Sequence, residues 1–167
     1  MTEIDTDRTA DAAIGADDQP PPAGAPVITR GVRRGLAERG FASLMEFSLP
    51  CSRRADVLAF DPAGTLIIVE VKSSVTDFRT DRKWPEYRDW CDAFYFAVDD
   101  RFPTELIPDD CGLMVADAFG AAVLREAPVE RLAAARRKSL IQRAALVAAG
   151  RLHRIEDPLF TASVPNS

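Results

Sequence analysis

Two runs of strand-forming residues joined by a short turn constrain the fold of this chain most strongly. Residues 54–61 and 66–74 are rich in apolar and β-branched side chains, and residues 61–64, Asp-Pro-Ala-Gly, have the composition of a turn. This pattern predicts a β-hairpin. Charged residues interrupt both of its strands, although a charge is rarely buried without a partner. The interruptions therefore indicate a site within the hairpin.

The interrupting residues are Asp56, Glu70 and Lys72. If the hairpin loop has three or five residues, Asp56 lies directly opposite Glu70, and directly opposed side chains point to the same face. Lys72 joins them because side chains alternate along a strand. A loop with an even number of residues would place the two acids on opposite faces. The proposed site therefore depends on this register.

Two carboxylates and an amine on one face suit metal-dependent cleavage of a phosphodiester. Asp56 and Glu70 can hold a hard divalent cation, Mg²⁺ or Mn²⁺, which activates water and neutralises developing charge. Lys72 can orient or deprotonate the attacking water or meet the scissile phosphate. A structural cluster of buried ion pairs is the alternative explanation for the same three residues.

The remaining pattern predicts an α/β domain. Apolar residues at helical spacing predict a first helix over residues 27–40, with Gly40 as its stop, and a helix from about Val129 to Ala149, which Gly150 ends. A turn or short helical piece up to Lys83 should precede a firmer helix from about Trp84. The expected strands cover residues 41–49, 54–61, 66–74, 93–98, 112–117 and 121–125.

Charge and composition divide the chain into three parts. Residues 1–26 contain six acidic residues and one arginine, which equals the whole net charge of −5. This acidic, proline-rich leader is expected to be disordered, with an autoinhibitory mimic of DNA phosphate as the alternative. Residues 27–154 should form one domain, and residues 155–167 a frayed tail.

Several classes of protein are excluded by what the sequence lacks. It has no run long enough to span a membrane and no pattern of a secretory signal, and its three cysteines, Cys51, Cys91 and Cys111, suit a reducing cytoplasm. A single histidine, His153, gives little material for acyl-transfer catalysis, and no glycine-rich phosphate loop is present. We therefore expect a cytoplasmic protein that uses neither ATP nor a dinucleotide.

The order of the expected elements and the residues Asp56…Glu70-Val71-Lys72 resemble the PD-(D/E)xK nuclease superfamily. Longer strings are similar to one of its members, the MmcB family of bacterial DNA-repair proteins, from about residue 28 through residues 134–138. These strings are Arg53-Arg54-Ala55-Asp56-Val57, Ile68-Val69-Glu70-Val71-Lys72-Ser73-Ser74, Asp77-Phe78-Arg79-Thr80-Asp81-Arg82-Lys83-Trp84-Pro85-Glu86-Tyr87 and Cys91-Asp92-Ala93-Phe94-Tyr95-Phe96-Ala97-Val98.

The resemblance implies a restriction-endonuclease-like core, α-β-β-β-α-β, with a mixed central sheet and a C-terminal helix. It implies Asp56 and Glu70 as metal ligands and Lys72 as the catalytic amine. The proline that often precedes the aspartate in this superfamily is Ala55 here, a change that removes no ligand. A third acid is expected at Glu46, with Glu38 on the first helix as the alternative.

The activity that the resemblance implies is DNA hydrolysis in the DNA-damage response, with DNA and other repair proteins as partners. The rival is a DNA-binding or repair-partner module that retains the fold but does not cleave. Candidate DNA contacts flank the hairpin site: Arg53, Arg54, Lys83, Trp84 and Tyr87. Arginines paired with nearby acids and aromatics in the core are the structural alternatives. A basic stretch on the last helix, Arg136, Arg137, Lys138 and Arg143, reads as a solvated face or as a phosphate-binding surface.

Overall fold

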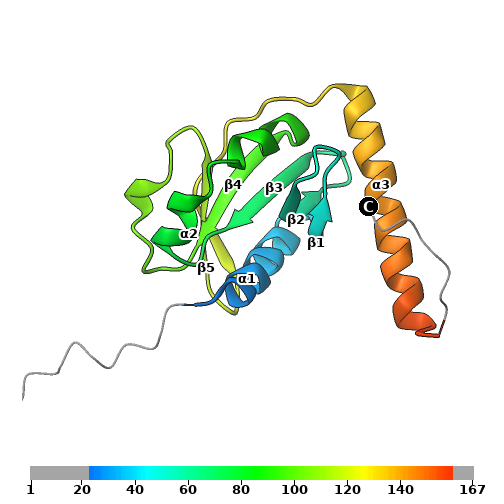
Figure 1. Cartoon of the computed structure of the whole chain (residues 1–167), viewed down its shortest axis with the longest axis horizontal. Coiled ribbons are helices and arrows are strands. Elements are labelled where there is room, and N and C mark those ends of the chain that lie inside the picture. Colours follow the sequence, from blue (N-terminus) through cyan, green and yellow to red (C-terminus); the bar gives the residue numbers. More distant parts are fainter. Residues whose placement is uncertain (1–22, 160–167) are drawn as a thin grey trace, which may run out of the picture.

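A computed structural model describes residues 23–159 of the 167-residue chain (Figure 1). Most of the expected leader and the end of the expected tail lie outside these residues. Within them, no helix combines the length and apolarity needed to cross a membrane. In chain order the elements are α1 (Ala25–Glu38), β1 (Ala42–Ser48), β2 (Arg54–Phe60), β3 (Leu66–Val71), α2 (Val75–Thr80), the 3₁₀ helix η1 (Trp84–Trp90), β4 (Ala93–Val98), the 3₁₀ helix η2 (Thr104–Leu106), β5 (Gly112–Ala116), β6 (Ala121–Arg125) and α3 (Ala134–Glu156).

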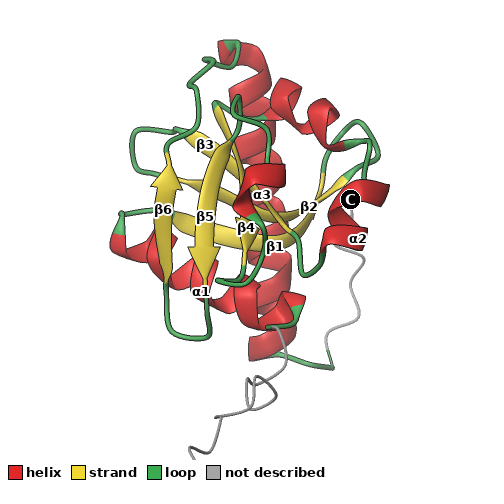
Figure 2. Ribbon diagram, turned by 90° about the vertical axis from the view of Figure 1, so that its left-hand side faces the viewer, coloured by secondary structure: helices red, strands yellow, loops and turns green. Residues whose placement is uncertain are grey.

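The strands form one mixed sheet in sequential order, β1-β2-β3-β4-β5-β6. The pairs β1–β2, β2–β3 and β5–β6 are antiparallel, whereas β3, β4 and β5 run parallel. Figure 2 shows β6 at one edge of this twisted sheet. The predicted α/β class, with its mixed sheet and C-terminal helix, is confirmed.

The register of the β2–β3 hairpin is the predicted one. Val57 pairs with Val69 and Phe60 pairs with Leu66, so an odd number of residues joins the strands. The turn is closed by Asp61, whose carboxylate accepts a hydrogen bond from the Thr65 N–H at 2.8 Å. One step beyond the last pair, this register places Asp56 opposite Glu70, as the proposed site requires.

One face of the sheet is covered by α1 (Figure 1). The helix buries Ile28, Val32 and Leu36 at helical spacing against strand residues such as Val57 and Val69. Gly31 and Gly35 lie on the same buried side, where α1 crosses the β5–β6 turn. A Cβ atom at Gly31 would lie only 2.1 Å from the Asp117 carbonyl oxygen. Glycine therefore lets the helix axis approach the sheet closely.

The other face of the sheet packs against η1, α2 and part of α3. Its core contains Phe94 and Phe96, which contact the rings of Trp84 and Phe78. The firmer helix expected from Trp84 is instead the short 3₁₀ helix η1, and α2 precedes it. Asp81 separates the two helices, because its carboxylate accepts the Lys83 N–H at 3.0 Å after α2 has ended.

The last helix begins and ends later than the sequence pattern indicates. Asp92 holds residues before Ala134 outside the helix: the Glu130 N–H donates to its carbonyl, and the Leu132 N–H donates to its carboxylate at 2.9 Å. The prediction that Gly150 ends the helix is wrong. Gly150 lies buried inside α3, which continues to Glu156, just before Asp157 and Pro158, where a proline disfavours helical geometry in the preceding residue.

Candidate active site

The two acids of the hairpin hold the ends of β2 and β3 together through their side chains. Beyond the last backbone pair, the Asp56 N–H donates to Oε1 of Glu70 at 3.2 Å. In return, the Val71 N–H donates to Oδ2 of Asp56 at 2.9 Å. The strands therefore part at this point, and each carboxylate is fixed by a main-chain donor of the other strand.

Lys72 extends the same cluster. Its side chain is buried, and its Nζ atom lies 4.0 Å from Oε2 of Glu70 and 2.6 Å from Oδ2 of Asp81. Asp81 follows α2 in the chain, and it is the tertiary structure that brings its carboxylate next to the hairpin. The structure thus brings together Asp56, Glu70 and Lys72, as predicted, and adds Asp81. In the sequence, Asp81 is one of many charged residues in residues 76–91, and nothing there identifies it as the partner of Lys72.

The electrostatics of the two opposed acids favour a cation between them. Burial and the neighbouring Asp56 carboxylate raise the pKa of Glu70 to about 8, and burial also raises the pKa of Asp56. The hydrogen bonds above occupy one oxygen of each carboxylate. The other two, Asp56 Oδ1 and Glu70 Oε2, are the atoms that could hold a metal ion, and the Lys72 ammonium lies 4.0 Å from the second. Hard oxygen donors of this kind fit Mg²⁺ or Mn²⁺.

Asp81 differs from the other two acids. Burial would raise its pKa, but the hydrogen bonds from the Lys72 ammonium and the Lys83 N–H hold the pKa of Asp81 below its usual value. Asp81 is therefore an ionised partner of Lys72. It keeps the ammonium at one end of the carboxylate pair.

Glu46, the expected third acid, is not part of the cluster formed by Asp56, Glu70 and Lys72. Glu46 is exposed, has a left-handed backbone (φ 48°), and lies with its Oε2 atom 3.7 Å from the Arg54 guanidinium. It lines the same cleft as Asp56, whereas Glu38 is the exposed last residue of α1 and does not line that cleft. Residues 23–159 contain no group of three or more His, Cys, Asp and Glu side chains arranged to hold a metal.

The candidate DNA contacts next to the hairpin have partners within the protein. Arg53 forms a two-pronged ion pair with Glu86, with N–O distances of 2.9 and 2.8 Å. Trp84 stacks on Phe94 with 5.7 Å between ring centroids. Tyr87 is buried, and its hydroxyl donates to the Arg54 carbonyl at 3.1 Å. Lys83 is exposed and directly precedes η1. Arg53, Trp84 and Tyr87 therefore have structural partners whether or not they also contact DNA.

Two residues of the basic stretch on the last helix also contact other parts of the protein. Arg137 forms an ion pair with the buried Asp92, and Arg136 lies over the Trp90 ring at 4.9 Å. Lys138 is exposed. The two arginines thus attach the start of α3 to the body of the molecule.

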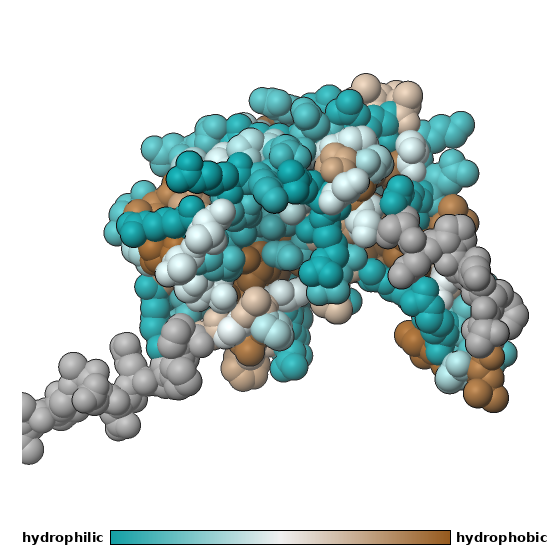
Figure 3. All heavy atoms as spheres, in the orientation of Figure 1, coloured by the Kyte–Doolittle hydropathy of each residue, from teal (hydrophilic) through white to brown (hydrophobic). Residues whose placement is uncertain are grey.

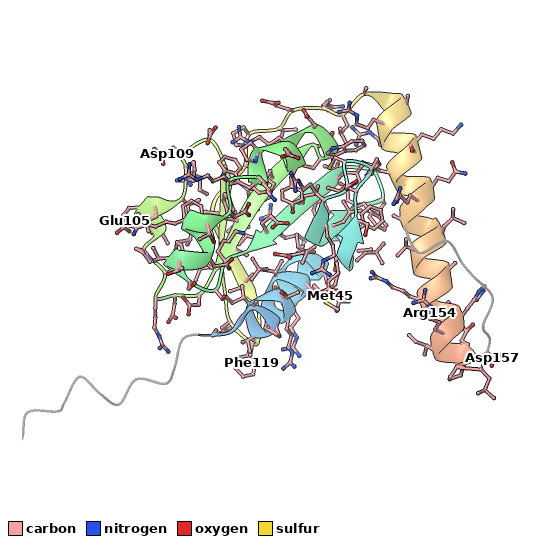
Figure 4. All side chains as sticks on the ribbon, viewed as in Figure 1. Met45, Glu105, Asp109, Phe119, Arg154 and Asp157 are labelled. Carbon is pink, nitrogen blue, oxygen red and sulfur yellow. The ribbon has the colours of Figure 1, made fainter. Side chains whose placement is uncertain are left out.

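A cleft of about 1040 Å³ opens beside Asp56, between α1 and the C-terminal half of α3. Figure 3 shows the molecular surface notched there, and Figure 4 shows Met45, one of the lining residues, between the two helices. Four arginines line it: Arg30, Arg33, Arg34 and Arg151. Sequence reasoning did not single them out. The three on α1 could have been found from their spacing. Arg33 and Arg34 follow Arg30 by three and four residues, so all three lie on the same side of the helix, away from the sheet.

Comparisons with known proteins identify relatives of this chain. A family model described as "DNA repair protein MmcB-like" matches residues 15–159. A solved structure titled "SPO1766 protein of unknown function from Silicibacter pomeroyi" is 44% identical, with a TM-score of 0.80. The similarity covers 83% of this chain and 95% of that chain. No curated protein matched the chain.

Proposed function

Because the chain belongs to the MmcB-like family of DNA repair proteins, we propose that it is a metal-dependent nuclease acting on DNA. The observation that carries this proposal is the fixed pair Asp56–Glu70 with Lys72 beside it. Asp56 also lines the arginine-rich cleft. Opposed buried carboxylates destabilise one another unless a cation or a proton neutralises them. Nucleases of this kind need such a cation.

Each residue has a distinct part in the proposed reaction. Asp56 and Glu70 hold Mg²⁺ or Mn²⁺, and such an ion supplies an activated water and neutralises charge on the phosphate when it is bound. Lys72, whose ammonium lies within 4.0 Å of Glu70, orients the attacking water or contacts the scissile phosphate. Asp81 positions that ammonium, at 2.6 Å.

The first prediction tests cleavage directly. Single-stranded, duplex and branched DNA are incubated with the protein in Mg²⁺, Mn²⁺ or EDTA. We expect cutting only with the metal, and a loss of about 10²–10⁴-fold in rate in both Asp56→Asn and Lys72→Ala. Asp109→Asn, which changes an exposed acid paired with Arg125, is the control and should cut at the wild-type rate. Metal-dependent cutting that survives both site substitutions would indicate a contaminating enzyme and reject the proposal.

A non-cleaving DNA-binding module is the second candidate. Two observations favour it: the described residues provide two opposed metal-binding acids rather than three, and the Lys72 ammonium is already held by Asp81. In the same assay this candidate predicts metal-independent binding and no cutting of any of the three substrates.

A further inference from the structure

The arginines of the cleft differ from six other arginines of the described residues. Arg39, Arg53, Arg54, Arg88, Arg125 and Arg137 each form an ion pair with a carboxylate. Within residues 23–159, none of the four cleft arginines does. Arg33 donates to Ser43 Oγ, Arg34 to the Ala118 carbonyl and Arg151 to the Glu46 carbonyl, all neutral acceptors. None of the four guanidinium groups around this cavity therefore has a carboxylate of the described residues in ion-pair contact, although backbone hydrogen bonds and, to a smaller extent, the nearby Arg34 lower the pKa of the Asp117 carboxyl.

The arrangement of these arginines follows from the way in which α1 packs. The helix turns its apolar residues and glycines onto the sheet, so Arg30, Arg33 and Arg34 are exposed on the side that lines the cleft. Arg151 lies on the opposite wall, on α3, and its guanidinium reaches the Glu46 carbonyl of β1 at 3.3 Å. The only acids among the lining residues are Glu46 and Asp56.

From this geometry we infer that the cleft binds the sugar–phosphate backbone of one nucleic-acid strand and leads it to Asp56. This inference rests on the proposed action of the Asp56 site on DNA and specifies the form of the substrate. Guanidinium groups are suited to phosphate oxygens, and neutralising several phosphates supplies most of the affinity in such complexes.

The lining of the cleft is suited to contacts with a phosphate backbone rather than with bases. With a volume of about 1040 Å³, the cleft is of a size to hold a short stretch of one strand. The lining residues include no aromatic ring on which a base could stack. The contacts are therefore with phosphates, which position a strand without reading its sequence.

Binding of fluorescent single-stranded and duplex DNA, followed by anisotropy in EDTA over a range of salt concentrations, tests the inference. Wild type should bind the single strand more tightly and with little base preference. Arg30→Ala/Arg151→Ala, with one change on each wall, should weaken binding roughly tenfold or more and reduce the salt slope by about 1.4. Arg30→Lys/Arg151→Lys should retain most of the affinity, because lysine also binds phosphate as a point charge.

The matched control is Arg79→Ala/Arg131→Ala, which removes two exposed charges outside the cleft. Thermal melting shows whether each variant is folded. An equal loss of affinity in this control, or an unchanged salt slope in the cleft variant, would overturn the inference. So would duplex binding that is as tight and depends equally on Arg30 and Arg151.

Failure of the inference is distinguishable from failure of the proposed nuclease. A protein that binds single strands through these arginines but never cuts contradicts the nuclease proposal alone. A protein that cuts DNA, but whose binding is independent of Arg30 and Arg151, contradicts the cleft assignment alone.

Discussion

The contacts of Lys72 bear both on the stability of the fold and on the proposed reaction. Its ammonium is buried, with Asp81 at 2.6 Å and Glu70 at 4.0 Å. Removing one member of a buried ion pair leaves the other charge without compensation, which is more damaging than removing both. The same contact that stabilises the fold also fixes the amine next to the carboxylate pair.

A double-mutant cycle at this contact gives a prediction at the residue scale. Asp81→Asn should lower the free energy of unfolding by about 2–4 kcal/mol, because the Lys72 ammonium loses its main partner. Lys72→Met combined with Asp81→Asn should cost at least about 1 kcal/mol less than the sum of the single changes. Urea denaturation measures all four proteins, with Asp100→Asn as an exposed control. Strict additivity would show that the two side chains are not coupled.

At the scale of the elements, α1 depends on its two buried glycines. They bring the helix close enough to the β5–β6 turn to cover the sheet and to turn the arginines toward the cleft. A periodic pattern of apolar residues identifies such a helix, but it does not show how closely the helix approaches its neighbour. That distance is fixed by which segment lies beneath Gly31 and Gly35.

The substitution Gly31→Ala tests this close approach. An ordinary helical glycine replaced by alanine gains about 1 kcal/mol of stability, so the sign of the effect is decisive. Here the added Cβ would overlap the Asp117 and Gly120 carbonyl oxygens, and we expect a loss of about 1–3 kcal/mol in urea denaturation. Gly120→Ala, whose Cβ would meet nothing within 4 Å, should stay within about 0.5 kcal/mol of wild type. A stabilised Gly31→Ala protein would contradict the packing described here.

For the whole molecule, Asp92 is the residue that joins distant segments. Its buried carboxylate accepts hydrogen bonds from the Leu66 N–H at the start of β3, from the Leu132 N–H and from the Arg137 guanidinium on α3. Burial would raise the pKa of Asp92, but these hydrogen bonds hold it below its ordinary value. Asp92 therefore attaches α3, one wall of the cleft, to the sheet.

The stability that Asp92 contributes depends on pH. Because the pKa of Asp92 is lower in the folded state, its contribution is complete above the unfolded pKa of about 3.9 and is lost as the pH falls through the folded pKa. We expect Asp92→Asn to cost about 2–4 kcal/mol at neutral pH and to reduce the loss of stability in acid. Urea midpoints between neutral and acidic pH measure both effects, and hydrogen exchange in α3 should rise. Equal acid sensitivity of wild type and variant would rule out this role.

The sequence by itself determined the hairpin and the condition under which Asp56, Glu70 and Lys72 converge, because alternation along strands is a local property. The structure decided that the loop is odd and the condition is met. The sequence also determined the six strands to within a few residues. Only the tertiary structure decided that Asp81 meets Lys72, that Asp92 delays the start of α3, and that arginines from α1 and α3 share one cleft. These contacts join segments far apart in the chain, and no local periodicity records which of them will pack together.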